Sequence, residues 1–275
     1  MLQKNKEWHR SMDNILSKAK DNIILLNKLV ENDLKSRYSG SAFGLVWAYI
    51  QPLVTVLVFW YVFQLGFRNP PVDNVEFILW FIAGYIPWTF FNDGLLSSSN
   101  VMYEYSYLVK KMKFKVWMLP IIKVLSSFYI HVFFIVFIIG MYFLYGYSWR
   151  IEWLSVFYYS FGIMMLLIGL AFMVSSLAVF FKDMAQLVNV ILQIGFWLIP
   201  IFWSDSTMNE NILRVLKFNP LYYILTGYRE ALINGTGFWE GSVRMTLYFW
   251  GVVAVILLIG MKVYKTLRVH FADLL

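Results

Sequence analysis

Few residues in this 275-residue chain are of types that perform chemistry. Cysteine is absent, which excludes a thiolate nucleophile, a disulfide and a cysteine-bound metal. The three histidines, His9, His131 and His270, lie far apart in sequence, which argues against a histidine metal site. The sequence contains no Gly-x-x-x-x-Gly-Lys-Ser/Thr phosphate loop, no His-Glu-x-x-His and no Gly-x-Ser-x-Gly. We therefore expect no catalytic residue, no metal, no bound cofactor and no ATP hydrolysis by this chain.

Aromatic side chains are the largest chemical excess, since Phe, Trp and Tyr make up 20% of the residues. Flat aromatic rings can stack on sugar rings, whereas a proton or ion pathway would need carboxylates and histidines. Helix packing and anchoring at a membrane interface are the alternative explanation. Five of these residues are candidates for the wall of a sugar passage: Phe59, Trp60, Phe63, Phe196 and Trp197.

Charged residues within apolar segments are the second group of candidates. Asp93 lies inside one apolar run, Arg229 and Glu230 lie in a short later one, and Arg244 begins the last. A charge at membrane depth indicates function by default, because lipid does not solvate it. The alternative is that each of these residues marks the end of a span.

The composition indicates whether water or lipid surrounds the chain. Hydrophobic residues make up 60% of the chain and charged residues 14%, whereas soluble domains are about half apolar and about a quarter charged. So much apolar surface requires lipid around it, so we predict an all-α integral membrane protein. The net charge of +7 is explained by the orientation of the spans and by contact with anionic lipids, so no nucleic-acid partner is expected.

Apolar runs of about 20 residues, enough to cross a hydrocarbon core of about 30 Å, predict six transmembrane helices. They lie at roughly 42–66, 76–98, 120–146, 154–180, 184–203 and 244–264. Only six of the 23 Lys and Arg residues lie on the side opposite the termini: Arg68, Arg150, Arg214, Lys217, Arg229 and Arg244. Because Lys and Arg are enriched on the cytoplasmic side, we expect both termini in the cytoplasm and the chain in the plasma membrane.

The segment before the first span is predicted to be a helix. Within residues 1–41, apolar residues recur at steps of three and four from Trp8 to Val30, while basic residues occupy the opposite face. Such a helix suits the surface of a bilayer, and packing against a protein is the alternative.

Three further segments belong to the six-span domain at 42–264 or follow it. Residues 100–119 are a basic and aromatic cytoplasmic loop, long enough for one short helix and suited to docking a partner. Residues 204–243 contain two apolar stretches too short to span, which predicts re-entrant helices on the outer side. Residues 265–275 form a cytoplasmic tail.

Short motifs along most of the chain, from about Leu29 to its end, form a familiar pattern. They are Asp33 to Ser41, Gly44 to Trp47, Gln51-Pro52, Phe180 to Asp183, Ile199-Pro200-Ile201, and Phe218 to Leu221 with Arg229 after it. Together they resemble the ABC-2 type permeases that export polysaccharides and polyol phosphates. The runs Phe59 to Arg68 and His270 to Leu275 are most similar to the wall teichoic acid permeases of that family. Lys182 departs from the family pattern, which more often has Arg before Asp183.

This resemblance implies a permease that pairs with a second copy of itself and with two copies of an ATP-binding subunit, which would use ATP and Mg²⁺. The substrate would be a cell-wall polymer on undecaprenyl diphosphate, moved from the inner to the outer face of the membrane. Spans one and five would line the passage. Wall teichoic acid is the expected polymer, with an O-antigen or capsular polysaccharide as the alternative.

The implied partners suggest roles for charged residues. The diphosphate would contact Lys35 and Arg37 on the cytoplasmic side and Arg229 on the outer side. The ATP-binding subunit would contact Glu104, Tyr107, Lys110 and Lys111 in the 100–119 loop. Two other classes remain open: an integral membrane lipid-phosphate or glycosyl transferase, and a membrane scaffold. A transferase would need converging acids, bases or metal ligands, which the sequence does not supply.

Overall fold

The computed structural model describes residues 2–67, 71–72, 75–111, 114–205 and 208–275, and their side chains from residue 20 onward except Leu65. Arg68, and the side chains of the N-terminal helix before Lys20, therefore lie outside the described part. Within that part the chain is helical and has no β-strand, which confirms the predicted all-α class. The α-helices are α1 (Leu2–Arg37), α2 (Trp47–Trp60), α3 (Phe77–Ser99), α4 (Val101–Glu104), α5 (Ser106–Val109), α6 (Met118–Leu144), α7 (Ser155–Ala178), α8 (Met184–Leu198), α9 (Glu210–Leu216), α10 (Pro220–Arg229), α11 (Val243–Leu267) and α12 (Phe271–Leu274).

Four helical stretches of the described residues are long and apolar enough to cross a membrane: Gly44–Gln64, Met118–Leu144, Ile151–Ala178 and Val243–Leu274. Two of the six predicted spans are not among them. The 23-residue α3 is long enough, but its Trp, Tyr, Asn and Asp side chains lower its hydropathy. The apolar helix α8 has 15 residues, fewer than the roughly 20 that a straight span needs. The structure thus supports a multi-span protein, and the count of six stays a prediction.

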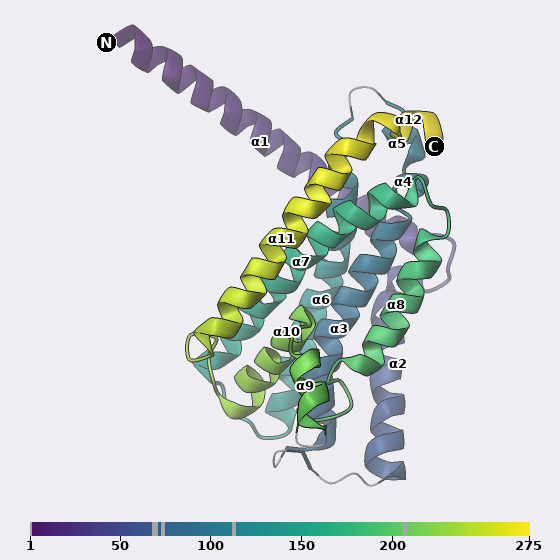
Figure 1. The fold of residues 1–275 in the computed structure, drawn as a ribbon, viewed down its shortest axis with the longest axis vertical. Helices are drawn as coiled ribbons and strands as arrows, with labels where there is room; N and C mark the ends of the chain where they lie inside the picture. The colour runs from purple at the N-terminus through teal and green to yellow at the C-terminus, as the bar shows by residue number, and fades with distance from the viewer. Residues whose placement is uncertain (1, 68–70, 73–74, 112–113, 206–207) are drawn as a thin grey trace.

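The helix α3 is the centre of the bundle (Figure 1). It packs against α6, α7, α8 and α10, and most of its residues are buried, from Phe77 to Ser99. A helix covered by protein on most sides need not present a lipid-facing stripe, and its polar residues Asn92 and Asp93 line a cavity instead of facing lipid.

The α7 and α11 helices form the closest helix pair of the bundle. A Cβ atom at Gly260 of α11 would collide with the carbonyl oxygen of Gly169 in α7, and one at Gly169 would lie 2.9 Å from the backbone nitrogen of Leu257. Backbones approach this closely only where glycine removes the side chain.

The fifth predicted span ends earlier than the sequence pattern suggests. It was predicted to reach residue 203, but α8 ends at Leu198 and Ile199 is extended, with φ −95° and ψ 146°. Pro200 is the physical reason, because a proline disfavours the helical conformation of the residue before it.

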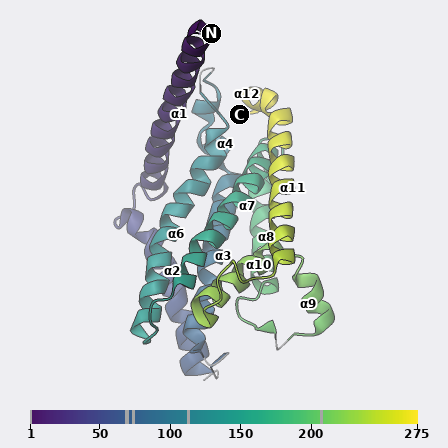
Figure 2. The ribbon, with the colours of Figure 1, turned by 90° about the vertical axis from the view of Figure 1, so that its left-hand side faces the viewer.

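Both termini lie at one end of the bundle, and α9 lies at the other end (Figures 1 and 2). At the end with the termini, the 100–119 segment folds into α4 and α5 instead of one short helix. Val101, Met102 and Val109 are buried there in one cluster with Val30 of α1 and Phe271 of α12. The three segments predicted to be cytoplasmic therefore pack together.

This arrangement generates a topology prediction. A reporter fused after Leu275 should be cytoplasmic and one inserted beside Asn209 should be outside, because the C-terminus and α9 lie at opposite ends of the bundle. Activities of alkaline phosphatase and green fluorescent protein fusions at both positions measure this. If both positions report the same side of the membrane, the six-span topology is wrong.

Candidate functional site

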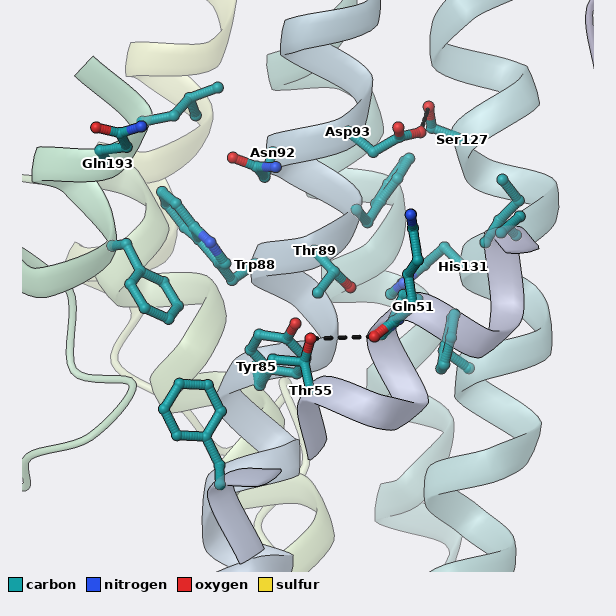
Figure 3. A pocket seen from close by; sticks show the side chains of 18 of the residues that line it. Gln51, Thr55, Tyr85, Trp88, Thr89, Asn92, Asp93, Ser127, His131 and Gln193 are labelled. Atoms are coloured by element: carbon teal, nitrogen blue, oxygen red, sulfur yellow. Dashed lines mark hydrogen bonds between the residues drawn. The ribbon is translucent and has the colours of Figure 1, made fainter. Parts of the chain in front are cut away.

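A cavity of about 530 Å³ lies among α2, α3, α6 and α8 (Figure 3). Its polar wall contains Gln51, Thr55, Asn92, Asp93 and Ser127, with Gln193 of α8 across from them. The Thr55 hydroxyl donates a hydrogen bond to the Gln51 carbonyl at 3.0 Å, which Figure 3 shows as a dashed line. Side-chain amides and hydroxyls both donate and accept hydrogen bonds, as the hydroxyl groups of a sugar require.

Aromatic rings line the same cavity. They are Tyr85 and Trp88 of α3, Phe59 of α2, and Phe196 and Trp197 of α8, and Tyr85 lies beside Thr55 (Figure 3). The Trp88 and Phe196 rings lie 5.8 Å apart between centroids, and Phe196 and Trp197 lie 5.5 Å apart in an edge-on arrangement. The cavity thus combines ring faces with hydrogen-bonding groups.

The structure brings together three of the five residues singled out as a passage wall. Phe59, Phe196 and Trp197 line the cavity, but Trp60 and Phe63 are not among its lining residues. The Phe63 ring instead packs 5.3 Å from Phe77 and 5.7 Å from Phe202. For Trp60 and Phe63, helix packing is therefore the role that the geometry describes.

His131, which in the sequence is one of three isolated histidines, lies in the cavity wall. His131 is buried, and its Nε2 lies 3.1 Å from the Ser160 hydroxyl and 3.0 Å from the Tyr228 hydroxyl. Its Nδ1 has no hydrogen-bond partner, and the ring stacks on Phe90 at 4.6 Å. His131 therefore packs into the wall of the cavity through its ring and is held there by contacts from α7 and α10.

An ion-pair network lies at the polar end of the cavity and connects four helices. The ammonium of Lys123 in α6 lies 2.6 Å from Asp33 of α1 and 2.5 Å from Glu104 of α4. Arg37 of α1 joins Asp33, at 3.0 Å, to Asp93 of α3, at 2.9 Å. Because Asp93 also lines the cavity, the network links that cavity to the segment expected to dock an ATP-binding subunit.

Neutral groups complete the network. The Tyr105 hydroxyl donates to Asp33 at 2.9 Å, and the Ser127 hydroxyl donates to Asp93. Burial alone would raise the pKa of Asp33, but the charges of Arg37 and Lys123 outweigh it and lower that pKa below its usual value. Asp33 is therefore a charged carboxylate at neutral pH, held by two cations.

The cations expected to contact a diphosphate lie in three different environments. Lys35 is exposed and pairs with Glu31 at 2.6 Å, whereas Arg37 is held inside the network. The Arg229 guanidinium lies 3.5 Å from the Trp80 ring centroid and donates to the Trp80 and Ile201 carbonyls, each at 3.3 Å. Two of the three are thus already engaged within the protein.

The residues expected to contact an ATP-binding subunit all reach the surface. Glu104 pairs with the buried Lys123 ammonium, yet 47% of its side chain is exposed. Tyr107 is 59% exposed, and the Lys111 ammonium lies 5.9 Å from its ring centroid. Lys110 is also exposed. The surface available to a partner is therefore formed by Glu104, Tyr107, Lys110 and Lys111.

The network predicts how Lys123→Met should behave. Removing the ammonium leaves Asp33 buried with one cation fewer, which should destabilise the fold by roughly 3–5 kcal/mol. Adding Asp33→Asn should recover part of that loss, and Lys35→Met, which breaks only an exposed pair, should change little. Thermal unfolding of the unmodified chain, the two single variants and the double variant measures this. Equal stability of the Lys123→Met and Lys35→Met variants would contradict the network.

Comparison with known proteins identifies the family. The sequence model of the ABC-2 type transporter family matches residues 25–233. Two O-antigen export system permease proteins RfbA from Klebsiella pneumoniae are 26% and 25% identical over 252 residues, which is 91% of this chain and 95% of each relative. The O-antigen export system permease protein RfbA of Myxococcus xanthus is 23% identical over 256 residues, which is 90% of this chain and 94% of the relative's length. The resemblance seen in the short motifs is confirmed: the chain belongs to the ABC-2 type transporter family.

Proposed function

We propose that this chain is the permease subunit of an ABC exporter for a lipid-linked polysaccharide. The observation that carries the proposal is the cavity between α2 and α8, which combines aromatic rings with amide and hydroxyl groups. These helices correspond to predicted spans one and five, which the family resemblance implies as the lining of the passage. Rings would support the sugar faces, and Gln51, Asn92 and Gln193 would exchange hydrogen bonds with the sugar hydroxyls.

Pairing with a second copy is the next part of the proposal. On α2, Val54, Leu57 and Val58 are exposed, and on α8 Ile191 and Ile194 are exposed. Two copies facing each other through α2 and α8 would cover this apolar surface and enclose the cavity between them. The remaining outer faces of the bundle would contact membrane lipids.

ATP hydrolysis would come from a separate subunit, present in two copies and using ATP and Mg²⁺. Tyr107, Lys110 and Lys111 offer it an exposed aromatic and basic surface, in a membrane chain whose termini we place in the cytoplasm. Glu104, whose side chain is partly exposed beside them, would contact the subunit while paired with Lys123. Movement of α4 on ATP binding would then be transmitted to Asp93 at the cavity through the ion pairs.

Two polymers stay open as the exported substrate. The curated relatives are O-antigen export permeases by name, which favours an O-antigen type of polysaccharide. The motif runs at Phe59 to Arg68 and His270 to Leu275 favour wall teichoic acid. Either polymer would be carried on undecaprenyl diphosphate to the outer face. A transferase is less well supported, because Asp93 is the only carboxylate among the described lining residues and it pairs with Arg37.

The passage is tested by Trp197→Ala and Gln193→Ala. Trp197 is 65% exposed and Gln193 is also exposed, so neither change should reduce thermal stability much. Both should reduce polymer export strongly, because each removes a group from the cavity wall. Export by membranes carrying the chain and its ATP-binding subunit, measured beside thermal stability, gives the answer.

Phe63→Ala is the matched control for these two variants. Its partly buried ring does not line the cavity but stacks on Phe59, which does, so its loss should lower stability by about 0.5–3 kcal/mol and lower export less than the two wall variants do. If Trp197→Ala and Gln193→Ala export polymer at the normal rate, the cavity is not the passage.

The coupling surface is tested by Tyr107→Ala combined with Lys111→Ala. We expect weaker co-purification of the ATP-binding subunit and less stimulation of its ATPase activity, at a normal membrane level of the permease. Replacing the exposed Lys262 and Lys265 by alanine is the control for loss of positive charge. If the Tyr107→Ala, Lys111→Ala variant still binds the ATP-binding subunit and stimulates its ATPase activity normally, the 100–119 segment does not form the interface.

A further inference from the structure

Another cavity, of about 380 Å³, lies where α9 meets the first turn of α11 and has basic side chains in its wall. Its lining residues are Arg214, Lys217, Phe218, Ser242, Arg244, Met245 and Tyr248. Three of the seven carry a positive charge, and none carries a negative charge. Such a concentration of cations in a concave site indicates an anionic ligand.

The positive charge of this cavity is only weakly balanced by the protein. Arg214 lies 3.6 Å from Glu210, and both side chains are largely exposed. Lys217 lies 3.8 Å from Asp205, and Arg244 forms no ion pair with the residues that the structure describes. Exposed pairs of this length contribute little free energy, so a ligand can replace them at low cost.

One other feature of the cavity favours an anionic ligand. The first turn of α11 lines the cavity, and the side chain of its N-cap residue Ser242 does not cap it. The helix end adds partial positive charge to that of the three side chains. The Tyr248 hydroxyl, by contrast, donates a hydrogen bond to the Phe218 carbonyl at 2.7 Å and so only holds Phe218 beside the cations.

The surroundings indicate that the anion belongs to a lipid. Phe218 is 68% exposed, and Ile212 and Val215 of α9 are exposed as well. Exposed apolar side chains beside cations are typical of a segment at the surface of a bilayer.

We propose that the cavity formed by Arg214, Lys217 and Arg244 binds the phosphate group of a membrane lipid. Its location at the outer surface rests on the proposed topology, because α9 lies at the end of the bundle opposite the termini (Figures 1 and 2). Two sources share this chemistry: the diphosphate of the exported carrier lipid and the headgroup of an anionic phospholipid. Arg229, expected earlier to serve on this side, is engaged with Trp80 and Ile201, whereas the three cavity cations are open to a ligand.

The test measures binding of single lipids to the purified chain in detergent by microscale thermophoresis. The probes are undecaprenyl diphosphate, short-chain phosphatidylglycerol and, as a lipid without phosphate, diacylglycerol. The unmodified chain should bind at least one phosphate-bearing lipid, and diacylglycerol should bind much more weakly. Each of Arg214→Gln, Lys217→Gln and Arg244→Gln should weaken phosphate binding by about tenfold. The tighter phosphate-bearing ligand identifies the source, and either source supports the site.

The matched control carries glutamine at Lys20, Lys262 and Lys265, three exposed lysines away from this cavity. It should bind both phosphate lipids as the unmodified chain does, while the triple variant of the cavity loses binding at unchanged thermal stability. Normal binding by the cavity variant, equal loss in the control, or equal binding of diacylglycerol would overturn the proposal. The measurement needs neither transport nor ATP, so failure of the proposed passage would show only in the export of Trp197→Ala and leave this result unaffected.

Discussion

The buried ammonium group of Lys123 is the contact on which the end of the bundle with the termini depends. It lies between carboxylates of α1 and α4, and through Asp33 and Arg37 it reaches Asp93 of α3. A buried charge is costly unless its partners stay in place, so these helices must keep their relative positions for the fold to be stable. The apolar cluster around Val30 and Phe271 packs at the same end. The ion pairs and this apolar cluster together connect α1, α4 and α12 to the polar end of the cavity.

The helical class and most helix positions follow from the sequence. In lipid the backbone N–H and C=O groups of an apolar run must bond to each other, and a helix achieves this within one segment. The structure differs where tertiary packing or a single residue decides. The α3 helix is enclosed by protein, so its composition falls below that of a lipid-facing span. The α8 helix stops before Pro200 although the apolar run continues. The 100–119 segment forms two short packed helices, which a basic and aromatic composition does not reveal.

The sequence predicts the chemical character of the candidate site, but only some of the residues that form it. An excess of aromatic residues indicates rings for a sugar, but Phe59 and Phe63 share one helix face with stacked rings, and only their depth along the helix decides that Phe59 lines the cavity while Phe63 packs against Phe77. In the sequence, Lys123 is one more cytoplasmic charge, since its partner Asp33 lies 90 positions away. His131 shows no local pattern at all, because Ser160 and Tyr228 reach it from other helices.

The glycine contact between α7 and α11 has a mechanical consequence for the molecule. Two backbones in direct contact cannot slide or rotate past each other without a clash, so these helices behave as one stiff block. In contrast, α2 lies at the edge of the bundle, and only its Ala48 and Val56 are buried. A rearrangement between inward-open and outward-open states would therefore leave the α7 and α11 block fixed as a stator, while α2 and the short α8, with a proline at its end, serve as the moving parts.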